Sequence, residues 1–146
     1  MDAPQQYETI LVERIGLVER ITLNRPEKRN ALSPRLQDAI TAADALLIAS
    51  PEYAHGVTGT IKNTLDWVVN HAPFAGKPVA VLNPSYQSFH ADEALKETLR
   101  TMSADLVLDA CLRIPVIGSG ADPDRIADIP RFAVPISAAL RALIAH

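Results

Sequence analysis

Cysteine is almost absent from this sequence, and aromatic residues make up only 5% of its 146 residues. The single cysteine, Cys111, excludes an internal disulfide and indicates a reducing environment. No apolar run approaches the ~20 residues that a membrane-spanning helix needs. The first residues contain neither a basic region nor an apolar stretch, so we expect a cytoplasmic protein with no membrane partner and no secretory signal.

An excess of positive charge is also missing. The chain carries 14 basic and 17 acidic residues, a net charge of −3, and we therefore expect no nucleic-acid partner. Neither a nucleophile elbow nor a Walker-type glycine loop occurs. Four histidines are scattered without the spacing of metal ligands, which predicts no metal site: His55, His71, His90 and His146.

The first forty residues predict a β-hairpin, a loop and the start of a helix. Residues 7–14 and 17–24 are rich in β-branched and apolar side chains, with a tight turn at Ile15-Gly16. A polar, basic loop follows at residues 24–30. Ser33 then offers an N-cap and Pro34 a first helical residue, and apolar spacing predicts a helix over residues 34–43.

After this helix the pattern alternates between buried strands and helices. Such alternation predicts an α/β fold in which a parallel sheet has helices on both faces. The predicted strands are residues 45–49, covered on both faces, 78–82, and 112–117, placed near an edge by Pro115; the predicted helices are residues 58–69, 92–102 and 135–145. The side chains expected to face the core from the first two helices are Ile61, Leu65, Trp67, Val68, Leu95, Leu99 and Met102.

Two loops follow the first two of these strands, at residues 50–63 and 83–88. Ligands of open parallel sheets bind beyond the carboxyl ends of the strands. The first loop is stiffened by Pro51 and presents Tyr53, an aromatic surface of the kind on which a flat conjugated ring packs. The alternative interpretation is a rigid surface turn whose Tyr53 packs against a neighbour. His55 on the same loop approaches a bound ring, or is an exposed loop residue.

The segment after residue 41 resembles the NAD(P)H-dependent FMN reductase family. Three strings of residues are the basis of the resemblance: AADALLIASPEY at 42–53, KNTLDW at 62–67 and FAGKPVAV at 74–81. The resemblance covers about residues 41–146. It implies a flavodoxin-like fold, a homodimer or tetramer, FMN as cofactor and NAD(P)H as the hydride donor. The flavin would carry the chemistry itself, so the resemblance predicts no catalytic side chain.

The resemblance also implies which residues bind the cofactor. Pro51, Glu52 and Tyr53 match the loop that cradles the isoalloxazine ring of FMN, and Ala54 replaces an asparagine that is common in the family. The second loop of the family contacts the other side of the ring, and here it consists of Pro84, Ser85, Tyr86 and Gln87.

Residues 7–37 are similar instead to the start of the enoyl-CoA hydratase/isomerase family, through YETILVER at 7–14 and ITLNRPEKRNALS at 21–33. We therefore expect two segments: a hydratase-like piece at 1–40 and a flavodoxin-like reductase piece at 41–146. The predicted fold is then an incomplete flavodoxin-like parallel sheet preceded by a β-hairpin. The Ser-, Thr- or Gly-rich loop that holds the FMN phosphate in the reductase family is missing from the sequence.

Three functions remain open at this stage. The first is an FMN reductase whose cofactor binding is impaired by the missing phosphate loop. The second is an inactive, chimeric or truncated fold that acts only by forming oligomers, since strands of an incomplete sheet leave open edges. The third and weakest is acyl-CoA binding, because the oxyanion-hole donors and carboxylates of the hydratase family are not encoded.

Overall fold

The N-terminal strands form a small antiparallel sheet of their own. The computed structural model describes residues 5–6, 10–15, 18–23, 34–69 and 72–146. The sheet has the order β1 (Gln5–Gln6), β2 (Ile10–Ile15), β3 (Val18–Leu23). The predicted hairpin is confirmed, but Ile15 pairs with Val18 and belongs to the strand rather than to the turn. The turn itself, the predicted loop at 24–30 and the Ser33 cap lie outside the described residues.

Helix α1 (Pro34–Ala42) confirms the predicted helix and is tied to the main sheet by a lysine. The Nζ atom of Lys77 donates a hydrogen bond to the carbonyl of Thr41 at 3.1 Å and another to the carbonyl of Ala43. A cation at this end of a helix satisfies free carbonyls and offsets the helix dipole. Because Lys77 directly precedes a central strand, it holds the end of α1 beside that strand.

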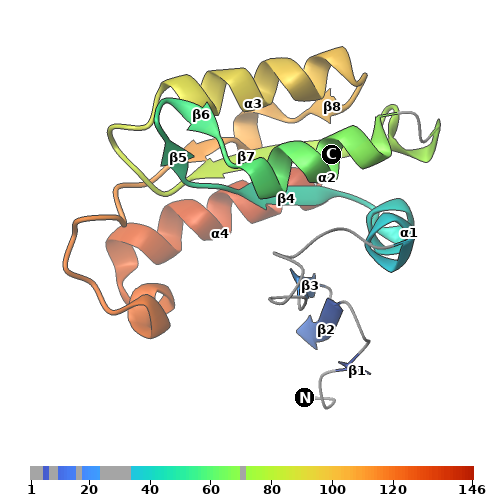
Figure 1. The fold of residues 1–146 in the computed structure, drawn as a ribbon. Helices are drawn as coiled ribbons and strands as arrows, with labels where there is room; N and C mark the ends of the chain where they lie inside the picture. The colour runs from blue at the N-terminus through green and yellow to red at the C-terminus, as the bar shows by residue number, and fades with distance from the viewer. Residues whose placement is uncertain (1–4, 7–9, 16–17, 24–33, 70–71) are drawn as a thin grey trace.

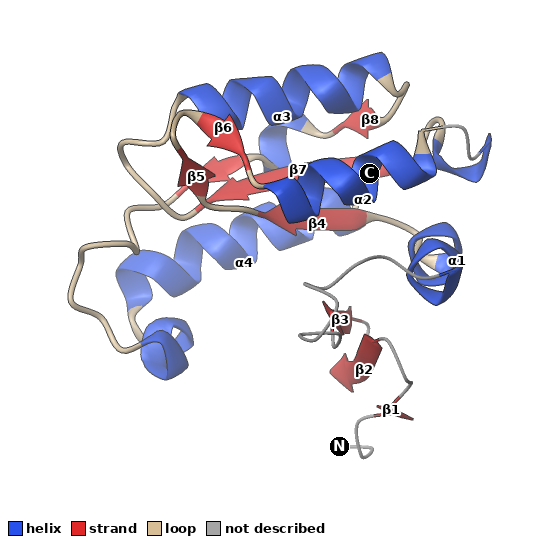
Figure 2. Ribbon diagram, viewed as in Figure 1, coloured by secondary structure: helices blue, strands red, loops and turns tan. Residues whose placement is uncertain are grey.

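The main sheet is parallel and lies between two layers of helices (Figure 1 and Figure 2). Strand β7 (Pro78–Asn83) is central: β4 (Leu46–Ala49) pairs with one side, and β8 (Asp105–Leu106) and β9 (Leu112–Arg113) pair with it as well. Helices α2 (Gly59–Val68) and α3 (His90–Thr101) cover one face and α4 (Pro130–Ile144) the other. The remaining elements are β5 (Glu52–Tyr53), β6 (Gly56–Val57), and the 3-10 helices η2 (Ala72–Phe74), η3 (Leu108–Ala110) and η4 (Pro123–Asp128).

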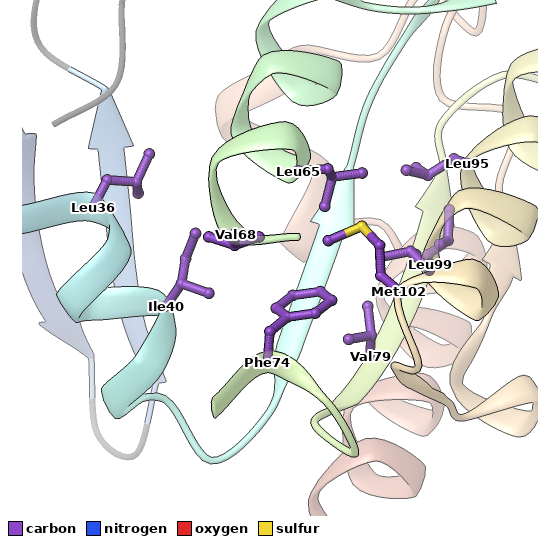
Figure 3. Close-up of a cluster of buried hydrophobic side chains, with 10 residues drawn as sticks. Leu36, Ile40, Leu65, Val68, Phe74, Val79, Leu95, Leu99 and Met102 are labelled. Atoms are coloured by element: carbon purple, nitrogen blue, oxygen red, sulfur yellow. The ribbon is translucent and has the colours of Figure 1, made fainter. Parts of the chain in front are cut away.

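The alternation of side chains along β7 builds a core on each face of the sheet. Val79 and Val81 point into a large cluster with residues of α1, α2 and α3, which Figure 3 shows. Ala80 points to the opposite face, where it packs with Leu143 of α4. The first cluster includes the predicted inward residues of α3, all of them buried: Leu95, Leu99 and Met102. The α/β fold with helices on both faces is thereby confirmed.

Strand β4 departs from the prediction that it is covered on both faces. Leu46 and Ile48 pack against the larger core, but Leu47 is 39% exposed and Ala49 is exposed too. The reason is position, because β4 ends the sheet in the order β4-β7-β8 and α4 packs against β7 and β9. The continuous apolar run therefore predicted a parallel strand, which is confirmed, but it also predicted burial on both faces, which is wrong.

Trp67 was predicted to face the core and is instead exposed on α2. Leu65 and Val68 are buried, three residues apart on one side of the helix. Each residue of an α-helix turns by about 100°, so Trp67 cannot share the side that both of them occupy.

The last two elements also begin or end at other residues than predicted. The third strand stops at Arg113 because Pro115 has no N–H, and the next two amides, of Val116 and Ile117, both donate to the carbonyl of Pro84. Helix α4 starts at Pro130 and contains Pro135, which was predicted to be its first residue. A proline inside a helix removes one backbone hydrogen bond, which the surrounding packing of this helix offsets.

Candidate functional site

The carboxyl ends of β4 and β7 bring two predicted ligand loops to one edge of the sheet. The two strands are parallel neighbours, and Ala49 lies beside Leu82 in the register. The loop after β4 and the loop after β7 therefore start side by side (Figure 1). This is the edge at which open α/β sheets bind their ligands.

The loop after β4 is a β-hairpin closed at its base and tip. At the base, the hydroxyls of Ser50 and Thr58 lie 3.4 Å apart, and Thr58 also caps α2 by accepting a hydrogen bond from the amide of Ile61. At the tip, β5 and β6 pair across a two-residue turn. This construction holds Tyr53 at the end of the hairpin with 70% of its surface exposed. Its aromatic face is therefore available to a ligand.

The loop after β7 is organised by the side chain of Asn83, which is buried. Its Oδ1 accepts from the amide of Ser85 at 3.0 Å, and its Nδ2 donates to the carbonyl of Ser88 at 2.6 Å. The Ser85 hydroxyl accepts from the amide of Gln87 at 3.2 Å. These bonds turn the chain sharply, and Tyr86 is left 70% exposed at the tip of the loop.

Between the two loops lies a cavity of about 10 Å³, which is room for one water molecule. The residues that line it come from both loops, from β7 and from α3: Ser50, Val57, Val81, Asn83, Ser88, Ala91, Asp92 and Leu95. Tyr53 and Ser85 are not among them. The predicted ring-facing residues therefore do not line this small cavity, whose lining consists of polar and apolar side chains in equal number.

A cluster of charged side chains around the buried Asp92 joins α3 to β9 near this edge of the sheet. The Asp92 carboxylate, whose side chain is 4% exposed, lies 2.8 Å from Nζ of Lys96 and 3.1 Å from a guanidinium nitrogen of Arg113. The Arg113 guanidinium also stacks on the ring of Phe89, 4.1 Å from its centroid. Asp92 is not among the site residues predicted from the sequence. Its partner Arg113 comes from a strand that follows α3, a contact with no local signal.

The eight predicted site residues fall into two groups of four. Pro51, Glu52, Tyr53 and Ala54 lie on the hairpin, and the second group lies on the loop after β7: Pro84, Ser85, Tyr86 and Gln87. The Glu52 side chain points into the protein and is only 9% exposed. In the described part of the chain, no group of three or more His, Cys, Asp or Glu residues is arranged to hold a metal ion.

Comparisons with known proteins show similarity in sequence and in fold. The chain is 43% identical over 70 residues to the NAD(P)H-dependent FMN reductase PA1204 of Pseudomonas aeruginosa, which covers 44% of this chain and 38% of that protein. Its fold resembles the solved structure of FerB, a flavoenzyme NAD(P)H:(acceptor) oxidoreductase from Paracoccus denitrificans, with a TM-score of 0.52 and 23% identity over 75% of this chain and 68% of that one. The chain thus spans less than two fifths of the curated reductase.

A second likeness is to the probable enoyl-CoA hydratase echA8 of Mycobacterium bovis. The two are 46% identical over 57 residues, which is 38% of this chain and 22% of that protein. The model of the family described as NADPH-dependent FMN reductase matches residues 6–115. That range starts within the first forty residues, so the division of the chain at residue 40 stays a prediction. Since the model matches most of the sequence, the chain belongs to the NADPH-dependent FMN reductase family.

Proposed function

We propose that this chain binds FMN at the carboxyl edge of its sheet and passes hydride from NAD(P)H to that flavin. The observation that carries the proposal is the pair of loops after β4 and β7. They begin side by side, and each carries an exposed tyrosine at its tip, Tyr53 and Tyr86. Family membership supports it independently. We place this activity in the cytoplasm, where Cys111, the free cysteine of the chain, stays reduced.

The residues at this edge fit the ring of FMN better than its phosphate. Tyr53 and Tyr86 offer aromatic surfaces, and Pro51 and Ala54 add apolar contact next to the first of them. Residues 1–45 contain no Ser-, Thr- or Gly-rich loop that leads from a strand into a helix, as a phosphate cradle would. We therefore expect binding to depend on the ring, with an affinity below that of relatives that hold the phosphate as well. Hydride transfer is chemistry that the flavin supplies when bound.

The test is a titration of the purified chain with FMN, followed by flavin fluorescence and the visible spectrum, and then by addition of NADPH. We expect quenching of the flavin, and about tenfold weaker binding after Tyr53→Ala, because a stacking surface is lost. Trp67→Ala is the control, since Trp67 is also an exposed aromatic residue but lies at the far end of α2. The absence of quenching and of flavin-dependent NADPH oxidation in the unmodified chain would refute the proposal.

A second candidate, association without catalysis, is favoured by the open edge of β4. Within the described residues, no strand pairs with the outer side of β4, and its four residues include neither a charge nor a proline. Such an edge is a template for pairing with another chain. We infer that a second copy of this chain covers it and forms a homodimer, or a tetramer built from two such dimers.

Light scattering after size-exclusion chromatography measures this association. We expect a dimer or tetramer for the unmodified chain, and a shift toward monomer in Leu47→Lys, which adds a charge to the edge strand. Leu108→Lys is the control, because Leu108 is exposed on η3, which packs against α4. A monomer at all concentrations, with cooperative unfolding, would exclude the association.

A further inference from the structure

The turn of the β5–β6 hairpin adopts a backbone that its residues do not favour. Ala54 and His55 both have positive φ, at 49° and 61°, between the paired residues Tyr53 and Gly56. Two consecutive left-handed residues are typical of a type I′ turn, which prefers Asn and Gly. A Cβ atom makes this conformation unfavourable, so the tip of the hairpin depends on contacts outside the turn.

The start of α3 lacks a capping side chain of its own. The residue before the helix, Phe89, has helical φ and ψ and no side chain that can cap the first turn. The Ala91 amide instead donates to Oε2 of Glu52 at 2.8 Å, across 39 residues of sequence. A carboxylate at this position satisfies a free N–H and is attracted by the helix dipole. Figure 1 shows the hairpin beside this end of α3.

The second oxygen of the same carboxylate reaches back to the turn. The Nδ1 atom of His55 lies 3.1 Å from Oε1 of Glu52, and the His55 ring meets the His90 ring edge to face, with centroids 4.6 Å apart. The bond from Ala91 and the bond and charge of His55 hold the pKa of Glu52 below 4.5, against the effect of burial. The other charged groups on this side are Asp92 and Glu93 of α3 and Arg113 of β9.

We propose that Glu52 is a positioning residue that fixes the tip of the hairpin, and with it Tyr53, to the first turn of α3. This inference deepens the proposed function, since it assigns to Glu52 the task of orienting the flavin-facing aromatic side chain rather than of touching the flavin. The carboxylate joins the strained turn at Ala54 and His55 to the uncapped first turn of α3. Each of these two structures therefore depends on the other for its geometry.

The test uses the full chain and compares Glu52→Ala with Glu97→Ala, which changes an exposed glutamate of α3. Hydrogen exchange of the Ala91 amide should accelerate about fivefold in Glu52→Ala, the usual effect of losing a cap, and FMN should bind about fivefold more weakly. Adding His55→Gly to Glu52→Ala relieves the positive φ of the turn at a residue that is not among the eight assigned to FMN. It should restore FMN affinity to within about twofold while the Ala91 amide stays unprotected. If Glu52 merely stabilised the fold, FMN affinity and protection of the Ala91 amide would be lost and restored together.

Two outcomes overturn the inference: exchange at Ala91, Gly56 and Val57 that is the same in Glu52→Ala as in Glu97→Ala, or FMN affinity that the turn substitution does not rescue. If the unmodified chain fails to bind FMN, the proposed function fails, and the exchange data still test the tether. If Glu52→Ala does not fold, Glu52→Gln is used in its place, because the glutamine oxygen can still accept a hydrogen bond from the Ala91 amide. The Ala91 amide resonance of the unmodified chain should then titrate with a midpoint below pH 4.5, because an acid with a lowered pKa loses its contacts as pH falls through that value. No such titration would also refute the tether.

Discussion

Replacing Leu99 with alanine lowers the free energy of unfolding by about 3 kcal/mol. Leu99 is 0% exposed and lies in the cluster between α3 and the sheet, with Val79 and Leu95 among its members. The substitution removes buried methyl groups and leaves a cavity that surrounding side chains fill only in part. Urea unfolding followed by circular dichroism measures the change.

Leu108→Ala is the matched control for Leu99→Ala. Leu108 is 62% exposed on η3, so the same change in side chain leaves no cavity and should alter the free energy by less than about 0.5 kcal/mol. Equal effects of the two substitutions would contradict the assignment of the core to the face between α3 and β7.

Replacing Asp92 with alanine lowers the free energy of unfolding by about 2 kcal/mol at neutral pH. Its carboxylate binds both Lys96 and Arg113, and its loss leaves two cations near a buried site without their anion. The expected cost is below the roughly 3–5 kcal/mol of a fully buried pair, because the Arg113 side chain is 30% exposed and turns toward water. Glu93→Ala is the control, since Glu93 also faces Lys96, at 3.5 Å, but is mainly exposed.

The same cluster predicts a loss of stability in alkaline solution. Burial acts to lower the pKa of Lys96, but the hydrogen bond and charge of Asp92, aided by Glu93, outweigh it and raise the pKa above 10.5. A cation with a raised pKa stabilises the fold at all pH values below 10.5, and this contribution disappears as pH rises through the raised value. The decline should be smaller in Asp92→Ala. An unchanged decline would show that Asp92 does not control the charge of Lys96.

Short-range hydrophobic patterns in the sequence predicted the strands and helices that depend on residues close together in the chain. The apolar run of β7 and the spacing of Leu95, Leu99 and Met102 on α3 predicted a buried strand and the inward side of a helix, and both are confirmed. The two ligand loops were located by the same reasoning, because they follow parallel strands. The assignment of their residues to FMN came from a family resemblance and remains a proposal.

Only the tertiary structure decided which groups meet across long stretches of sequence. Glu52 binds the first turn of α3, and Asp92 binds Arg113 from a later strand; neither contact has a periodic signal in the chain. The exposure of β4 depends on its place at the end of the sheet, which the composition of the strand does not encode. The sequence by itself determined the alternation of strands and helices, because hydrophobic periodicity acts over a few residues. The tertiary structure decided the bonds that hold the site together, because those bonds join residues that only the complete fold brings within reach.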